Sequence, residues 1–255
     1  MAIHEAARQG FSKESASYER GRPEYPDGLL GWLRDSLGAK PGAQVVDLGA
    51  GTGKFTRLLA RTGADVVAVE PVDAMRERLA LASPGIRALA GTAESMPLDD
   101  RSVDAMGCAQ AFHWFANSRA LQEIHRVLRP GGKLGLVWNV RDESVDWVAA
   151  ITAIITPYEG DAPRFYTGRW RQPFEQQDLF TPLECTVFAN SHVGTFDQVV
   201  IDRTMSVSFI AALPDDEKRA LEARLRVLRD SFPALREAEI SFPYRTEAWL
   251  GARLG

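Results

Sequence analysis

The stretch that decides the fold is VVDLGAGTG, residues 45 to 53, in which a short apolar run carries an acid and leads into three glycines at alternate positions. Glycines can adopt positive φ and let a ligand approach the backbone, and the amide groups that open the following helix favour an anionic group. A second apolar run, VVAVEP at residues 66 to 71, ends in Glu70, at the distance from the glycines where an acid can accept both ribose hydroxyls. The two runs predict two buried strands and a site for an adenosine cofactor.

The spacing of the glycines separates two classes of adenosine cofactor. A dinucleotide site usually has its third glycine three residues after the second, which leaves room for a pyrophosphate, whereas this chain has Gly49, Gly51 and Gly53. Asp47 lies two residues before the first glycine, and an acid suits an ammonium group better than a pyrophosphate. S-adenosylmethionine carries that ammonium group, a sulfonium and a ribose with both hydroxyls free. The residues therefore favour S-adenosylmethionine, although glycine-rich turns between a strand and a helix also occur for packing.

Three further segments agree and follow in order. They are GTAESMPLDDRSVDAM at residues 91 to 106, CAQAFHWF at 108 to 115 and LRPGGKLGLVWN at 128 to 139. With them the chain resembles class I S-adenosylmethionine-dependent methyltransferases, of the small-molecule branch that includes ubiquinone-biosynthesis-like, trans-aconitate-methyltransferase-like and type 11 enzymes. The resemblance covers residues 11 to 140, and beyond residue 140 it extends to general architecture only. It implies a methyltransferase whose cofactor is S-adenosyl-L-methionine.

The periodicity of the chain predicts an α/β fold with a doubly wound sheet. Strands are expected near residues 44 to 48, 65 to 70, 86 to 90, 103 to 108 and 133 to 138, with amphipathic helical patterns between them. Two later period-two runs, at 183 to 189 and 240 to 248, are expected to pair antiparallel. By the resemblance they complete a Rossmann-like seven-stranded sheet whose last strand is antiparallel. Thr195 and Gln198 are expected to open a helix as a capping box.

A single domain is the simplest division of a 255-residue chain. Its segments are expected to be an N-terminal helical cap (1–40), a cofactor-binding core (41–140), a helical and loop insertion that forms a lid (141–182), and C-terminal helices with the last two strands (183–255). The N-terminus lacks an apolar signal core, and no apolar run approaches the ~18 residues of a membrane span, so we expect a cytoplasmic protein.

Charge and cysteine content narrow the partners. The formal net charge of −4 argues against a protein that neutralises many phosphates, so we expect a small-molecule substrate and neither nucleic acid nor membrane as partner. An amino-methyltransferase that modifies bases would also carry an Asn or Asp and two prolines where this chain has residues 109 to 112, AQAF. Cys108 and Cys185 fall in predicted strands and are expected to be buried, reduced thiols. No cysteine and histidine cluster has metal-ligand spacing, so no metal is expected, and the choice between monomer and homodimer stays open.

Ligands in open α/β sheets bind beyond the carboxyl ends of the strands, which locates the cofactor site. Asp47 is expected to contact the methionine ammonium or to fix the glycine turn, and Glu70 to bind the ribose. Met75 either flanks the adenine or belongs to the helix core. The resemblance adds contacts to the adenine amino group after the third strand and backbone contacts beside the sulfur after the fourth. The predicted cofactor-binding residues are Asp47, Gly49, Ala50, Gly51, Thr52, Gly53, Glu70, Pro71, Met75, Thr92, Ala93, Glu94, Gln110 and Ala111.

Catalytic and substrate contacts are expected in three further places. His113 can act as a general base near neutral pH or be a hydrogen-bonded element of its loop, and Trp114 beside it is a candidate substrate contact. The N-terminal piece resembles the segment that closes over the cofactor in this family, with Tyr18 and Arg22 as cofactor contacts and Tyr25 as a substrate contact, or it is simply a capping helix. Arg169 and Trp170 belong to a basic aromatic cluster that either receives a substrate carboxylate or ring, or is a solvated loop.

The resemblance implies that a methyl group moves to an oxygen, nitrogen or carbon nucleophile of a small acceptor by in-line displacement. Because the sulfonium methyl is already activated, orientation can supply on the order of 7 to 11 kcal/mol, and a general base is unnecessary if the acceptor is a carboxylate. Two alternatives stay open. The same site could serve a cyclase or lyase that uses S-adenosylmethionine, or the chain could bind the cofactor without turnover.

Overall fold

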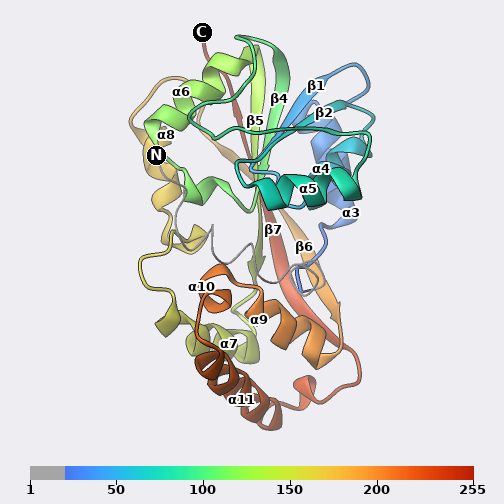
Figure 1. The fold of residues 1–255 in the computed structure, drawn as a ribbon, viewed down its shortest axis with the longest axis vertical. Helices are drawn as coiled ribbons and strands as arrows, with labels where there is room; N and C mark the ends of the chain where they lie inside the picture. The colour runs from blue at the N-terminus through green and yellow to red at the C-terminus, as the bar shows by residue number, and fades with distance from the viewer. Residues whose placement is uncertain (1–20) are drawn as a thin grey trace. The chain divides into compact units, whose positions relative to one another are not determined.

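A computed structural model describes residues 21–255 and divides them into two compact units (Figure 1). The core unit contains residues 27–138, 163–188 and 247–255, and the helical unit contains residues 21–26, 139–162 and 189–246. Three long strands contribute residues to both units. The segment 141–182, expected to form one insertion, is therefore divided between them at residue 162.

Seven strands form one mixed sheet in the order β3-β2-β1-β4-β5-β7-β6. Their bounds are β1 (Gln44–Leu48), β2 (Asp65–Val69), β3 (Arg87–Leu89), β4 (Val103–Ala109), β5 (Leu128–Arg141), β6 (Glu184–Gly194) and β7 (Ile240–Ala252). The first five strands pair parallel, and the last strand is antiparallel. The predicted doubly wound, Rossmann-like sheet is confirmed. Since the chain runs from β1 outward to β3 and then returns to β4, the order reverses between β1 and β4, where open α/β sheets bind ligands.

The helices of the core unit follow the apolar stripes of the sequence. They are α3 (Asp27–Trp32), η1 (Leu33–Leu37), α4 (Lys54–Ala60), α5 (Asp73–Ala82), η2 (Phe112–Trp114), α6 (Ser118–Val127), η4 (Phe165–Thr167), η5 (Arg169–Arg171) and α8 (Gln172–Glu175). Phe55, Leu58 and Leu59 bury the predicted stripe of α4, and Leu121 and Ile124 bury that of α6. The apolar face of each helix is therefore covered, and α4 packs against β1 and β2.

The helical unit contains α7 (Asp146–Ile155), η3 (Thr156–Tyr158), η6 (Asp197–Asp202), α9 (Arg203–Met205), α10 (Ser208–Ala211), α11 (Asp215–Ser231) and η7 (Pro233–Leu235). Here α11 packs beside α7 through its buried Leu221 and Leu225 (Figure 1). The predicted capping box is confirmed, because the Thr195 N–H donates to Gln198 Oε1 at 3.0 Å and the Gln198 N–H donates to Thr195 Oγ1 at 3.4 Å.

Two expectations about strands are corrected. The fifth strand begins at Leu128 rather than 133. Leu128 already pairs with Val103 of β4, and the turn with Gly131 at φ 73° shifts the register of the pairing without ending the strand. Cys108 is buried as expected, but Cys185 is exposed. The reason is that β6 is an edge strand with few covered residues, and alternation along a sequence does not distinguish an edge strand from a covered one. Within residues 21–255, no helix is long and apolar enough to cross a membrane.

Candidate functional site

The carboxyl ends of β1, β2 and β4 bring the first predicted site residues together. Asp47 of β1 lies opposite Ala68 of β2 on one side and Gly107 of β4 on the other. After β1 the chain turns at once, with the Gly49 N–H donating to the Val69 carbonyl at 2.8 Å. The glycine turn therefore begins at the edge where the strand order reverses.

The glycine turn is open where a ligand needs backbone access and tight where the chain needs packing. Gly49, at φ 72°, has no space for a side chain, because an added Cβ would lie 2.9 Å from Ala111 Cβ in the loop after β4. Gly51, at φ 56°, is different, since an added Cβ there would meet no atom of residues 21–255 within 4 Å. The left-handed backbone explains why both positions are glycine. Gly51 provides the open backbone surface that the cofactor prediction requires.

Asp47 is a buried acid with one oxygen unsatisfied. Its side chain is 1% exposed, and Oδ2 accepts a hydrogen bond from the Thr56 hydroxyl at 2.6 Å. Oδ1 is also buried and has no hydrogen-bond partner in the part of the chain that the structure describes. Burial raises the pKa of Asp47 to about 7, against the hydrogen bond from Thr56, and repulsion from Glu70 adds to the rise. An orphaned carboxylate oxygen at this place is suited to an external cation or donor.

Glu70, directly after β2, is the second buried acid. It is 6% exposed, Oε2 accepts from the Gly51 N–H and Oε1 from the Val72 N–H, each at 2.9 Å. Burial raises its pKa, although these two hydrogen bonds and nearby Arg76 oppose the rise. Each carboxylate oxygen keeps a second lone pair, so Glu70 can accept two further hydroxyl hydrogens. Its bond to Gly51 also ties the predicted ribose residue to the glycine turn.

These observations test whether S-adenosylmethionine fits. Two buried carboxyl groups that repel each other favour a cation between the glycine turn and β2 over a pyrophosphate, whose charge would add to the repulsion. Asp47 Oδ1 matches an ammonium group, Glu70 matches a ribose diol, and the backbone at Gly51 is open. The residues fit the cofactor that the sequence predicted.

The turn after β3, where adenine contacts were predicted, is shaped by its own backbone and by α6. Thr92 and Ser95 form an isolated antiparallel bridge, with Ala93 buried between them. The Glu94 carboxylate accepts from the Asn117 side-chain amide at 3.0 Å, and Asn117 Oδ1 caps α6 by accepting from the Ala120 N–H. Glu94 is therefore anchored to the start of α6, which fixes where its remaining acceptor positions lie.

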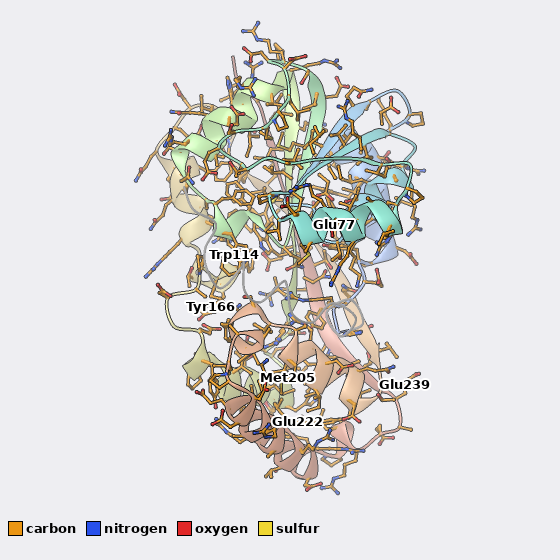
Figure 2. All side chains as sticks on the ribbon, viewed as in Figure 1. Glu77, Trp114, Tyr166, Met205, Glu222 and Glu239 are labelled. Carbon is orange, nitrogen blue, oxygen red and sulfur yellow. The ribbon has the colours of Figure 1, made fainter. Side chains whose placement is uncertain are left out.

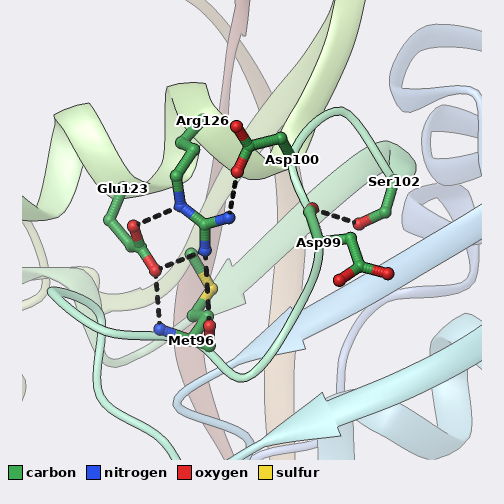
Figure 3. A network of polar contacts seen from close by, with 6 residues as sticks. All are labelled: Met96, Asp99, Asp100, Ser102, Glu123 and Arg126. Atoms are coloured by element: carbon green, nitrogen blue, oxygen red, sulfur yellow. Dashed lines mark hydrogen bonds and ion pairs between the residues drawn. The ribbon is translucent and has the colours of Figure 1, made fainter.

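A second anchor connects this turn to α6 through Arg126 (Figure 3). Arg126 donates to both oxygens of Glu123 at 2.8 Å, to Asp100 at 2.6 Å and to the Met96 carbonyl at 3.3 Å. Glu123 in turn accepts from the Met96 N–H at 2.7 Å. The hydrogen bonds from Arg126 lower the pKa of Glu123. Both backbone polar groups of Met96 are thereby held by α6, so the turn after β3 is fixed by side chains.

The loop after β4 carries the predicted substrate-facing residues. Gln110 adopts φ 58°, which is uncommon for a residue with a Cβ, and its N–H donates to the Val137 carbonyl at 2.8 Å. His113 follows in η2, and its Nδ1 accepts from the Trp138 indole N–H at 3.1 Å. An indole nitrogen only donates, so the neutral imidazole must carry its proton on Nε2. In this tautomer His113 is a hydrogen-bond donor at Nε2 and has no lone pair there to take a proton.

The other predicted residues lie in different surroundings. Met75 is buried on α5, while Ala50 and Thr52 lie in the glycine turn and Pro71 at the start of the β2 loop. Trp114 is half-buried beside His113, with ring centroids 5.3 Å apart. Trp170, 1% exposed, packs between Trp138 and Trp249, and its indole N–H has no hydrogen-bond partner among the described residues. Arg169 next to it is exposed.

The residues predicted in the N-terminal piece do not all fall within the described structure. Tyr18 lies outside residues 21–255. Arg22 and Tyr25 belong to the helical unit, where Arg22 donates to the Ser206 carbonyl at 2.9 Å. Their roles toward the cofactor or the substrate stay predictions.

Sequence reasoning missed the residues that hold the site residues in place. Thr56 could have been noticed as a hydroxyl within the apolar stripe of α4, next to Phe55. Asn117, Arg126 and Trp138 gave no such signal, because each acts on a residue between 23 and 30 positions away. For metals, no group of three or more potential ligands occurs in the described part of the chain.

Comparisons with known proteins place the chain in a family. Residues 46–136 match the family described as a methyltransferase domain. An uncharacterized methyltransferase-like protein of Schizosaccharomyces pombe is 39% identical over 94% of this chain and 93% of its own length, and an uncharacterized methyltransferase of Mycobacterium tuberculosis is 40% identical over 92% of each.

The solved structures agree on the fold. One assigned as a type II methyltransferase, from Anaeromyxobacter dehalogenans, aligns with a TM-score of 0.66 at 24% identity and covers 91% of this chain and 97% of its own. That identity supports the architecture alone, whereas the full-length relatives support the family. The chain belongs to the class I S-adenosylmethionine-dependent methyltransferases.

Proposed function

We propose that this enzyme transfers the methyl group of S-adenosylmethionine to a small-molecule acceptor, with the cofactor held by the carboxyl ends of β1 to β4. The unsatisfied Oδ1 of buried Asp47 is the observation that carries the assignment of the ammonium end. Glu70 accepts the ribose hydroxyls while it keeps its bonds to the glycine turn. Thr92, Ala93 and Glu94 receive the adenine, and Gln110 and Ala111 line the methyl-donor end.

The cofactor supplies an activated methyl group when bound, and the protein supplies position. Loop residues 110–114 follow β4 beside the glycine turn, which is in contact with Ala111. His113 is oriented by Trp138 as a donor at Nε2, so we assign it to positioning the acceptor by a hydrogen bond and not to proton removal. This supports a displacement in which orientation and exclusion of water carry the rate. Trp114 beside His113 is the proposed substrate contact in this loop.

One titration experiment tests the cofactor assignment. Isothermal titration of S-adenosylhomocysteine and NAD into the purified protein should show binding of the first and none of the second. Binding of NAD alone would remove the assignment. Mass spectrometry of the protein with S-adenosylmethionine and no acceptor tests the reaction type, and a product other than S-adenosylhomocysteine would favour a cyclase or lyase.

The class of acceptor and the location of the protein are proposed from the composition of the chain. The net charge of −4 supports a small-molecule acceptor over nucleic acid. Cytoplasmic location and the absence of a membrane partner stay predictions, which fractionation of cells that express the tagged full-length chain would test.

A further inference from the structure

In the helical unit, Arg203 has one buried nitrogen that no described residue pairs. Arg203 lies on α9 and donates through Nε to the Tyr244 hydroxyl at 3.2 Å. Its Nη1 is buried and has no hydrogen-bond partner among residues 21–255. None of the ion pairs found among residues 21–255 includes Arg203. A guanidinium nitrogen that is closed off from water without an acceptor is costly, because a buried donor loses its hydration and gains nothing.

The surroundings keep this guanidinium in one place. Tyr244, 3% exposed, is stacked on Phe242 along β7 at 5.0 Å between ring centroids, so its hydroxyl is a fixed acceptor. One end of the Arg203 fork is therefore anchored. The remaining nitrogens keep a planar geometry that matches the two oxygens of a carboxylate or phosphate.

A second arginine approaches the same short helix. An added Cβ at Gly21 would lie 2.7 Å from the Asp202 carbonyl oxygen and 2.9 Å from the Arg203 nitrogen, so residue 21 passes directly against the start of α9. Arg22 follows and donates to the Ser206 carbonyl at 2.9 Å. Two guanidinium groups thus belong to the environment of α9, on which Met205 is labelled in Figure 2.

We propose that Arg203, anchored by Tyr244, is a binding site in the helical unit for an anionic oxygen group, a carboxylate or a phosphate. This site goes beyond the proposed methyl transfer and rests on residues of the helical unit alone. It makes Arg203 a residue that selects anionic ligands. A neutral ligand would leave Nη1 buried and unsatisfied, which is the arrangement that most strongly disfavours a ligand.

Thermal unfolding of the full chain tests the site with malonate and inorganic phosphate as probes, against chloride at the same ionic strength. At least one of the two should raise the unfolding midpoint of the wild-type protein. Arg203→Met should raise the dissociation constant of that anion by roughly tenfold or more. Tenfold corresponds to the lower end of the range for a hydrogen bond to a charged group. Tyr244→Phe should weaken it as well, because it releases the anchored end of the fork.

Arg226→Met is the matched control. Arg226 lies in the same unit, on the exposed side of α11, and its ion pairs with Asp197 at 3.0 Å and Glu222 at 2.7 Å satisfy it. Glu222 is labelled on α11 in Figure 2. This variant should keep the full protection by malonate or phosphate.

A second readout separates binding from structure. Without an anion, Arg203→Met should be as stable as the wild type or more stable, because it removes an unpaired buried charge and keeps its volume. A destabilised Arg203→Met protein, or a wild type that neither anion protects, would overturn the proposal. Titration with S-adenosylhomocysteine keeps the two conclusions apart. If an anion raises the unfolding midpoint through Arg203 but S-adenosylhomocysteine does not bind, only the proposed cofactor site is overturned. If S-adenosylhomocysteine binds but no anion raises the unfolding midpoint, only the anion site is overturned.

Discussion

Replacing Asp47 by Asn should have opposite effects on stability and on cofactor binding. Asn has the same shape, its carbonyl can accept from the Thr56 hydroxyl as Oδ2 does, and it carries no charge. In the absence of cofactor, the variant should be more stable than the wild type at pH 8. With cofactor present, the stability difference between the two proteins should shrink or change sign, because the cofactor's ammonium group has no carboxylate to bind in the variant.

The magnitude follows from the raised pKa. A carboxyl group whose pKa rises from 3.8 to about 7 on folding prefers to be protonated in the folded state. The wild type therefore loses stability as the pH rises through this window, by about 4 kcal/mol in all at 1.36 kcal/mol per pKa unit. Below pH 4 the two proteins should differ little. Above pH 7 the variant should be more stable than the wild type by up to that amount, which already includes the loss of repulsion from Glu70.

Urea unfolding at intervals from pH 4 to pH 8 measures this difference, and isothermal titration measures cofactor affinity. Asp104→Asn is the control with the opposite sign. Burial raises the pKa of Asp104, but the hydrogen bond from the Gln44 N–H and the contact with Arg129 outweigh that effect and leave its pKa below the usual value. That variant should be less stable than the wild type at pH 8. Parallel pH curves for the wild type and Asp47→Asn would refute the argument, because a partly hydrated Asp47 would have no raised pKa.

Three further outcomes are expected. Glu70→Ala should weaken cofactor binding by roughly 1.5 to 3 kcal/mol in isothermal titration, the range for hydrogen bonds to a charged group, and unchanged affinity would remove Glu70 from the site. Arg126→Met should weaken adenosine binding by about 1 kcal/mol for each hydrogen bond lost from the turn after β3. It should leave kcat at saturating cofactor unchanged. Arg129→Met should change neither adenosine binding nor kcat. Equal losses of adenosine affinity in both variants would show that the Arg126 contacts are merely structural. His113→Gln keeps an N–H donor and should retain most activity in a turnover assay, while His113→Ala should lose roughly tenfold or more. The general-base role would be supported instead if both His113 variants lost the same activity and if the wild-type kcat rose with pH around 6.5, the ordinary range of a histidine.

The sheet could be predicted because its signals are local. The apolar run that ends at Leu48 and the glycines after it specify a strand and a turn within ten residues, and the same holds for the runs before Glu70 and Gln110. Because crossover connections between parallel strands are right-handed, only a few strand orders are compatible with these elements. Cys185 shows where this reasoning stops. Its period-two neighbourhood is that of a half-buried strand, but burial depends on what lies beside β6, and nothing in the run itself carries that information.

The acids and glycines of the candidate site could be chosen from the sequence, but the residues that hold them in place could not. Asp47 and Glu70 follow from position along their strands, whereas their raised pKa values depend on how completely the fold removes water around them. For His113 the type of residue indicated a base, and that role stays a prediction. The hydrogen bond from Trp138 to Nδ1 is the reason we propose donation from Nε2 instead, and no spacing rule relates the two residues.

Two unsatisfied charged groups, one in each unit, point to ligands of opposite charge. Asp47 Oδ1 in the core unit and Arg203 Nη1 in the helical unit are both buried, and neither has a partner among residues 21–255. If either were only structural, a partner or a neutral residue would stabilise the protein more, since an unpaired buried ion opposes folding. A cofactor with an ammonium group satisfies the first, and an anionic ligand satisfies the second. On this reasoning, the neutral variants of both residues should fold at least as well as the wild type above pH 7 and bind worse, each for its own ligand only. A variant that lost both stability and binding would show that the charge serves the fold.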